Sequence, residues 1–156
     1  MLSDNSMTEI AREISKYPPE QKRSAVMASL RIAQEEHGYL TRELVTHVAG
    51  ILDIPPVRAM EVATFYSMYD HDPVGRHKVN VCTNISCMIC GSDDVLDHLK
   101  RKLGIGPGEM TSDKKFSIKE VECLGACGGA PMMQIGKDYF ENLNPERIDQ
   151  ILDSLE

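Results

Sequence analysis

The 156-residue sequence lacks any long apolar run, and it is poor in aromatic residues, with no Trp and 5% aromatic content. A membrane-spanning helix needs about 20 consecutive apolar residues, so we expect no such span. The first ten residues carry two acids and no Lys or Arg, unlike a secretory signal peptide. We therefore expect a cytoplasmic protein, in which cysteines more often serve as ligands or redox groups than as disulfides.

Positive charge is also scarce. The chain has 17 Lys and Arg against 24 Asp and Glu, a formal net charge of −7, which argues against a nucleic-acid groove. The densest basic cluster, residues 100–102, comes just before Gly104. Because cations complement the C-terminal end of a helix, we interpret this cluster as the last turn of a helix and not as a phosphate site.

The first half of the chain has apolar residues at helical spacing, interrupted at Pro18-Pro19, at Gly38 and at residues 54–56. Thr41 is a predicted N-cap, and Pro56 is the predicted first residue of a fourth helix. The pattern changes at the turn-rich residues 71–75. We therefore expect an N-terminal helical bundle over residues 1–74 and a second domain over residues 75–156.

The second half predicts an α/β domain. We expect strands at residues 76–82, 116–121 and 132–135 and a short one near Tyr139, with a helix from Ser92 to about residue 103. Asn144 is the predicted N-cap of a last helix, with Pro145 as its first residue. Alternation of strands and helices of this kind forms a compact α/β layer.

Four of the five cysteines form two short pairs, Cys82-x4-Cys87 and Cys123-x3-Cys127, in predicted loops after predicted strands. Such pairs are typical of zinc or iron–sulfur ligands. A buried 2Fe-2S cluster with four thiolates is an anion and needs N–H donors around it. The glycines of the second loop would let the main chain approach sulfur closely; these are Gly125, Gly128 and Gly129.

Cys90 leaves alternatives open. Together with the first pair it gives the C-x4-C-x2-C spacing of plant-type ferredoxins, and Cys87-x2-Cys90 also matches a redox dithiol. A structural zinc takes four thiolates as well, whereas a Rieske centre is excluded because no Cys-x-His pair is present. From the residues we favour Cys82, Cys87, Cys123 and Cys127 as ligands and expect Cys90 to be a packed thiol.

Longer motifs surround these cysteines. They are EVATFY at residues 61–66, PVGRH at 73–77, Gly91-Ser92, LGI at 103–105 and ECLGAC at 122–127, which runs into APMM at 130–133. Over nearly its whole length the chain resembles the thioredoxin-like 2Fe-2S ferredoxin family, the E-type (24 kDa-type) subunit of respiratory complex I, or NADH:quinone oxidoreductase.

The resemblance implies an N-terminal helical bundle followed by a thioredoxin-like domain. It implies that Cys82, Cys87, Cys123 and Cys127 hold one 2Fe-2S cluster, that Cys90 is no ligand, and that the chain has no catalytic residues. The chain would be an electron-transfer subunit peripheral to the cytoplasmic face of the membrane. Its NADH and FMN would lie on a partner flavoprotein, in keeping with the absence of dinucleotide and P-loop motifs here.

Other partners that the resemblance implies are further peripheral-arm subunits of the same complex. The equivalent subunit of an NAD-dependent formate dehydrogenase or of an NAD-reducing hydrogenase is the alternative, and a zinc-stabilised interaction module is a less favoured one. Residues 61–69 are expected to be core by their spacing, although the resemblance favours a partner surface for some of Phe65, Tyr66 and Tyr69. Met132 and Met133 are expected to shield the cluster from water.

Overall fold

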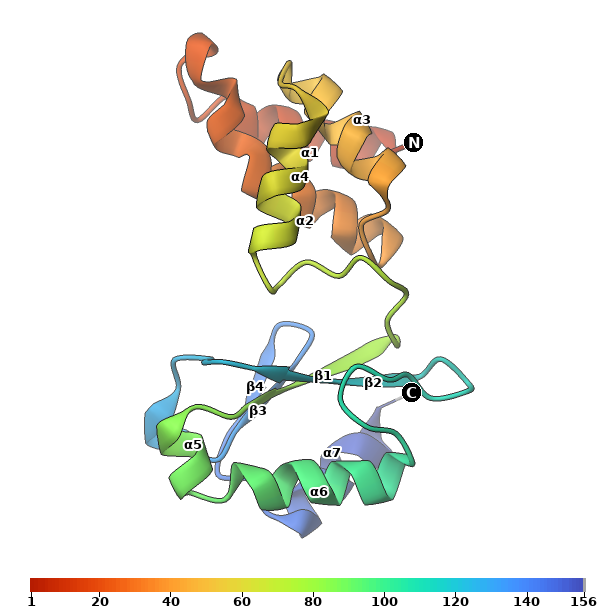
Figure 1. Cartoon of the computed structure of the whole chain (residues 1–156), viewed down its shortest axis with the longest axis vertical. Coiled ribbons are helices and arrows are strands. Elements are labelled where there is room, and N and C mark those ends of the chain that lie inside the picture. The colour runs from red at the N-terminus through yellow and green to blue at the C-terminus, as the bar shows by residue number, and fades with distance from the viewer. Residues whose placement is uncertain (156) are drawn as a thin grey trace. The chain divides into compact units, whose positions relative to one another are not determined.

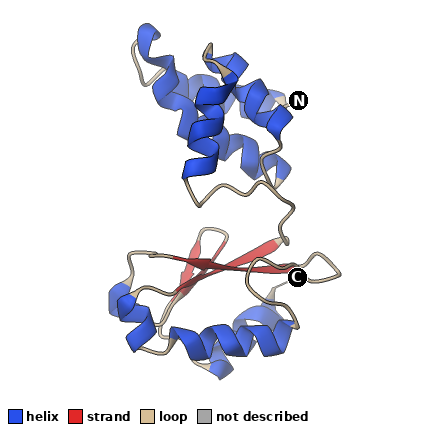
Figure 2. Ribbon diagram, viewed as in Figure 1, coloured by secondary structure: helices blue, strands red, loops and turns tan. Residues whose placement is uncertain are grey.

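The computed structural model describes residues 1–155, which fall into two compact units, residues 1–73 and the residues from 74 onward. Helices and loops make up the first unit, whereas the second combines a sheet with helices (Figures 1 and 2). None of the helices in the described part of the chain is long and apolar enough to cross a membrane. The α/β class expected from the sequence is confirmed.

The first unit has four α-helices and a 3-10 turn, bounded as follows: α1 Asp4–Ile14, η1 Pro19–Ala25, α2 Val26–His37, α3 Arg42–Leu52 and α4 Pro56–Phe65. The helix boundaries follow the capping residues. The Thr41 hydroxyl accepts a hydrogen bond from the Leu44 N–H at 3.2 Å, Gly38 ends α2 with a φ of 85°, and Pro56 opens α4. All three predictions are confirmed.

The core of this unit joins the inner faces of α2, α3 and α4. Leu30 and Ala33 of α2 pack with Val45, Val48 and Leu52 of α3, and all five are buried. Burying a Val or Leu side chain of this kind adds about 1.5–3 kcal/mol to the free energy of unfolding. The helical spacing of apolar residues in the first half of the sequence therefore also identifies the core of this unit.

The aromatic residues at the end of α4 and just after it divide into two groups. Tyr69 is buried, and its hydroxyl donates to the Met27 carbonyl at 2.9 Å. Burial raises the pKa of Tyr69 to about 12. Phe65 is 80% exposed and stacks edge-to-face on the exposed Tyr66, so the core expectation is wrong for these two. Because α4 ends at Phe65, the helical period no longer governs where the following residues point.

In the described residues, the second unit contains a four-stranded sheet, three α-helices and a short 3-10 helix. Their bounds are β1 His77–Cys82, α5 Ile85–Ile89, α6 Ser92–Leu103, β2 Phe116–Val121, η2 Cys127–Gly129, β3 Met133–Ile135, β4 Asp138–Phe140 and α7 Pro145–Ser154. The strand order is β2-β1-β3-β4. β2 runs parallel to β1, and β3 and β4 complete the sheet as an antiparallel hairpin. A parallel pair needs a crossover connection, which the chain supplies between residues 83 and 115.

Helices α6 and α7 cover the same face of the sheet (Figure 1). Val79 and Val81 of β1 pack there with Leu99 of α6 and with Ile148 and Leu152 of α7. Successive strand residues point to opposite faces, so Cys82, the residue after Val81, points away from this core. It belongs instead to a separate apolar cluster with Cys87 and Met132.

Candidate iron–sulfur site

The parallel pairing of β1 and β2 brings the two cysteine pairs together. Cys82 is the last residue of β1 and lies opposite Val121, the last residue of β2, in the strand register. The carboxyl ends of the two strands therefore meet at one edge of the sheet. The chain leaving β1 forms α5 (Figure 1), which carries Cys87. The chain leaving β2 leads to Cys123 and then to Cys127 at the start of η2.

The thiols of the two pairs are in contact. The Cys82 sulfur accepts hydrogen bonds from the thiols of Cys87 and Cys123. Cys127 lies near enough to Cys87 for its charge to raise the pKa of the Cys87 thiol. The structure thus gathers all four cysteines of the two predicted pairs at one place, from segments about forty residues apart in the sequence.

Backbone amides point at the buried pair. Burial alone would raise the pKa of the Cys82 thiol, but the amides of Asn84 and Leu124 and the two neighbouring thiols together hold that pKa below its usual value. For Cys87 burial prevails and raises the pKa to about 11, with Cys82 adding to the rise, although the Met132 amide acts in the opposite direction. N–H donors of this kind stabilise an anionic sulfur.

The glycine-rich loop supplies a further amide. The Gly125 N–H lies 3.3 Å from the Cys123 sulfur, and Gly125 has a φ of 74°, which glycine adopts without strain. The sequence predicts the same role for Gly128 and Gly129, but their surroundings differ from those of Gly125. The Gly129 amide donates to the Ala126 carbonyl, and its missing side chain leaves room for Glu141. A Cβ at Gly128 would meet no neighbouring atom.

The two pairs differ in exposure. Cys82 and Cys87 are buried, whereas Cys123 and Cys127 are exposed. Met132 is fully buried and packs on the Cys82 and Cys87 pair, as expected of a residue that keeps water from this side of the site. Met133 faces the other way, into the core beneath α6 and α7, because neighbouring strand residues alternate between faces. The shielding expectation is therefore wrong for Met133.

Cys90 is exposed, so the expectation of a packed thiol is wrong. It is the C-cap residue of α5, and its N–H donates to the Ser86 carbonyl at 3.1 Å. This short helix lies where the sequence predicts a loop around Cys87. Two features of the sequence could have predicted this helix. Asn84 is its N-cap, and the Asn84 side chain accepts a hydrogen bond from the Ile85 N–H at 2.7 Å. The apolar residues Ile85, Met88 and Ile89 then follow at i, i+3 and i+4 spacing.

The donor set suits a 2Fe-2S cluster. Three thiols are in contact and the fourth, Cys127, lies near them, where amides of Asn84, Leu124, Gly125 and Met132 point at sulfur. Such a cluster needs both thiolate ligands and N–H donors. Within residues 1–155, no group of three or more His, Cys, Asp or Glu side chains is arranged to hold a single metal ion.

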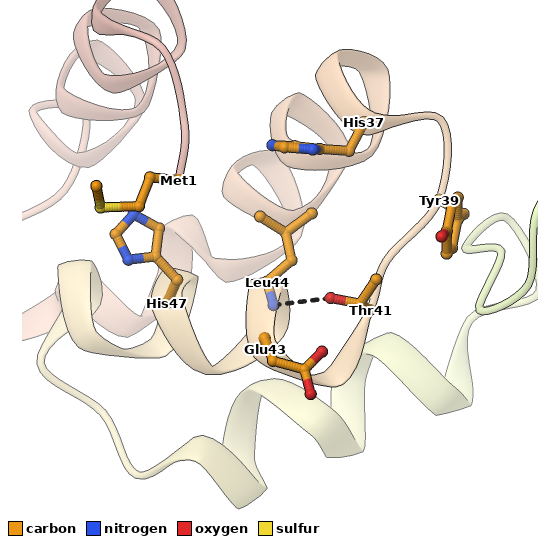
Figure 3. A pocket seen from close by; sticks show the side chains of 7 residues that line it. All are labelled: Met1, His37, Tyr39, Thr41, Glu43, Leu44 and His47. Carbon is orange, nitrogen blue, oxygen red and sulfur yellow. Dashed lines mark hydrogen bonds between the residues drawn. The ribbon is translucent and has the colours of Figure 1, made fainter.

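The helical unit has a hollow of about 340 Å³, shown in Figure 3. Its lining includes His37, His47 and Glu43, and the Thr41–Leu44 capping bond lies in its wall. A second hollow of about 600 Å³ lies between the start of α4 and residues Arg23 and Val26. Neither lining contains a cysteine, and we assign no chemistry to either.

The class of protein follows from a comparison with known families. Residues 10–156 match the family model of the thioredoxin-like [2Fe-2S] ferredoxins. The chain belongs to this family, and the cofactor of the family is one 2Fe-2S cluster.

Similar proteins narrow the class further. The chain is 49% identical over 143 residues to the E-type subunit of NADH-quinone oxidoreductase from Rickettsia bellii (strain RML369-C), a match that covers 91% of this chain and 86% of the relative. It is 47% identical over 146 residues to the E-type subunit numbered 2 of NADH-quinone oxidoreductase from Rhizobium meliloti (strain 1021), covering 94% and 86%.

A solved structure shares the fold. The crystal structure of an NAD+-reducing [NiFe]-hydrogenase in the air-oxidized state aligns with a TM-score of 0.69 over 81% of this chain and 22% of that chain. The sequence identity is 21%, so this likeness concerns the fold alone.

Proposed function

We propose that this chain is the electron-transfer subunit of an NADH:quinone oxidoreductase, and that Cys82, Cys87, Cys123 and Cys127 hold its one 2Fe-2S cluster. The observation that carries the proposal is the meeting of the two cysteine pairs at the carboxyl ends of β1 and β2. The relatives that share nearly half of their residues with this chain are subunits of that oxidoreductase.

Each part of the site has a physical role. The bound cluster would supply a centre that accepts and releases one electron. The four thiolates hold it, and the amides of Asn84, Leu124, Gly125 and Met132 offset the negative charge that gathers on sulfur. Met132 keeps water from the side of Cys82 and Cys87. The exposed Cys123 and Cys127 leave the other side open to a partner.

The proposed partner is the flavoprotein subunit that binds NADH and FMN, with which this chain would exchange electrons, together with other peripheral-arm subunits of the complex at the cytoplasmic face of the membrane. The shared fold of the NAD+-reducing hydrogenase fits the alternative, an equivalent subunit of another NAD-dependent enzyme. The two relatives at 49% and 47% identity favour the quinone oxidoreductase.

Electron transfer from NADH tests the proposal. The full chain is purified anaerobically with and without the co-expressed flavoprotein subunit, and visible absorbance and EPR follow the reduction of its cluster. We expect NADH to reduce the cluster only when the flavoprotein is present, because the chain has no dinucleotide-binding motif. A cluster that stays oxidised in the complex, or one that NADH reduces in the isolated chain, would contradict the proposal.

A further inference from the structure

Tyr139 of β4 reaches the cysteine loop from the opposite edge of the sheet. In the strand order β2-β1-β3-β4, the loop that carries Cys123 and Cys127 leaves β2 at one edge, and β4 forms the other edge. Phe140 packs on the core beneath α6 and α7, so its neighbour Tyr139 faces the other side of the sheet. There the Tyr139 hydroxyl donates to the Leu124 carbonyl at 2.8 Å.

The hydroxyl bonds to the same peptide unit that donates to sulfur. The Leu124 carbonyl and the Gly125 N–H belong to one planar trans peptide, so they point in opposite directions. The carbonyl accepts from Tyr139, while the N–H lies 3.3 Å from the Cys123 sulfur. A donor that fixes the carbonyl on one side of this peptide therefore fixes the N–H toward sulfur on the other side.

The orientation of this peptide needs such a constraint. Gly125 has a φ of 74°, and glycine adopts positive and negative φ about equally well, so the local backbone does not select one orientation. The reversed peptide would turn the Leu124 carbonyl oxygen toward an anionic sulfur and leave the Tyr139 hydroxyl without its acceptor. A donor on the carbonyl also polarises the peptide and strengthens its N–H as a donor, by about 10–30% per bond.

Leu124 joins the loop to the buried pair as well. Its own N–H donates to the Cys82 sulfur, so the N–H groups on the two sides of this residue serve two different cysteines. The position of Tyr139 is set by the sheet, because its backbone lies opposite Gln134 of β3 in the strand register. One hydroxyl held by an edge strand thus anchors the point at which both cysteine pairs receive amides.

We propose that Tyr139 is a positioning residue of the cluster site, whose hydroxyl holds the Leu124–Gly125 peptide with its N–H toward Cys123 and thereby raises the reduction potential of the bound cluster. This inference rests on the proposed function. Reduction adds one negative charge that spreads onto the thiolate sulfurs, and an N–H donor stabilises the reduced state more than the oxidised state. Tyr139 is no ligand in this proposal and acts only through the peptide.

Removal of the hydroxyl tests this role. Tyr139→Phe deletes one oxygen atom and keeps the ring, which is already 48% exposed, so we expect the variant to fold and to bind its cluster. Tyr17→Phe is the matched control, because it deletes the same atom from a tyrosine of similar exposure, 41%, in the helical unit. Redox titration of the two holo-proteins and the wild type, followed by EPR, gives each midpoint potential.

We expect the midpoint potential of Tyr139→Phe to be lower, with the ratio of reduced to oxidised cluster at a fixed potential falling roughly threefold, as for the loss of part of one hydrogen bond. Tyr17→Phe should titrate as the wild type does. A change that affected only stability would not shift the potential in this way. An unchanged potential in Tyr139→Phe, or an equal shift in Tyr17→Phe, would overturn the inference.

Hydrogen–deuterium exchange gives a second readout on the same peptide. Mass spectrometry of the fragment that spans residues 122–128 should show faster exchange in Tyr139→Phe, because the Gly125 N–H is no longer held on sulfur, and wild-type exchange in Tyr17→Phe. The measurement needs no cluster, so it also decides the matter for a variant that assembles little of it. Wild-type exchange in Tyr139→Phe would contradict the positioning role.

The two proposals fail in different ways. If NADH reduces the wild-type cluster through the flavoprotein but Tyr139→Phe has the wild-type potential, the role of Tyr139 is overturned and the proposed function stands. If the wild-type chain holds no 2Fe-2S cluster, the proposed function fails, and the role of Tyr139 fails with it.

Discussion

The two cysteine pairs occupy different kinds of structure. Cys82 ends a strand of the sheet and Cys87 lies on the inner side of α5, so both are buried and fixed by Met132 and by backbone amides. Cys123 and Cys127 lie in a glycine-rich loop and are exposed. One half of the site is therefore part of the packed domain, while the other half depends on the conformation of a loop.

This difference shows how a small domain reconciles two needs of an electron carrier. A buried half provides a defined geometry and protects sulfur from water. An exposed half leaves a short route to a partner.

Loss of a ligand should have the largest effect. Cys127→Ser removes a thiolate from the exposed pair, and we expect the cluster to be lost or deeply altered because serine is a poorer ligand for iron. Cys90→Ser, at an exposed thiol three residues after Cys87, serves as the matched control and should leave iron, sulfide and visible absorbance unchanged. The reverse pattern would favour the plant-type ligand set with Cys90.

Thiol accessibility should distinguish the pairs after the cluster is removed. We expect iodoacetamide to modify Cys123 and Cys127 well before Cys82 and Cys87, because only the first two are exposed. The two thiols of the buried pair should also differ from each other in how their reaction rates depend on pH. The lowered pKa of Cys82 lets it form a thiolate at lower pH than Cys87, whose raised pKa of about 11 delays its reaction to strongly alkaline solution.

Peptide mass spectrometry at intervals measures each rate, and the denatured chain gives the rates without structure. Equal rates for all four thiols in the folded, cluster-free chain would show that the pairs do not differ as described.

A change in the loop itself should have a smaller effect. Gly125→Ala puts a side chain at a φ of 74° beside Cys123, where an L-residue costs about 1–2 kcal/mol. Gly128→Ala is the matched control, because its φ is not positive and its Cβ would meet no atom; surface changes of this kind usually stay within about 0.5 kcal/mol.

We expect Gly125→Ala to lower the urea concentration at which cluster absorbance is lost and Gly128→Ala to leave it nearly unchanged. If the two variants behave alike, the positive φ of Gly125 is not what holds the exposed pair in place.

Much of the fold could be predicted because capping residues and periodicity are local signals. Thr41, Pro56 and Asn144 each mark the start of a helix, as predicted from the sequence. The Asn144 side chain accepts a hydrogen bond from the Arg147 N–H at 2.8 Å. The strands at residues 77–82 and 116–121 are likewise predicted by apolar residues that alternate with polar ones. Each of these features depends on a few neighbouring residues.

The features that the sequence predicts wrongly depend on tertiary structure or belong to short elements. α5 is too short to establish a helical period, so the sequence predicts a loop around Cys87. Burial of Cys90, Met133, Phe65 and Tyr66 depends on what lies opposite them, which no local pattern reveals. The grouping of Cys82, Cys87, Cys123 and Cys127 as ligands rests on spacing and family resemblance, and it stays a prediction.

Metal and sulfide analysis of the anaerobically purified chain, with EPR before and after dithionite, shows directly whether the chain holds a 2Fe-2S cluster. We expect two irons and two sulfides per chain, no EPR signal in the oxidised state and a spin-half signal after reduction. Stoichiometric zinc in protein made with ample iron and cluster-assembly capacity would contradict this expectation and would indicate a structural module in its place.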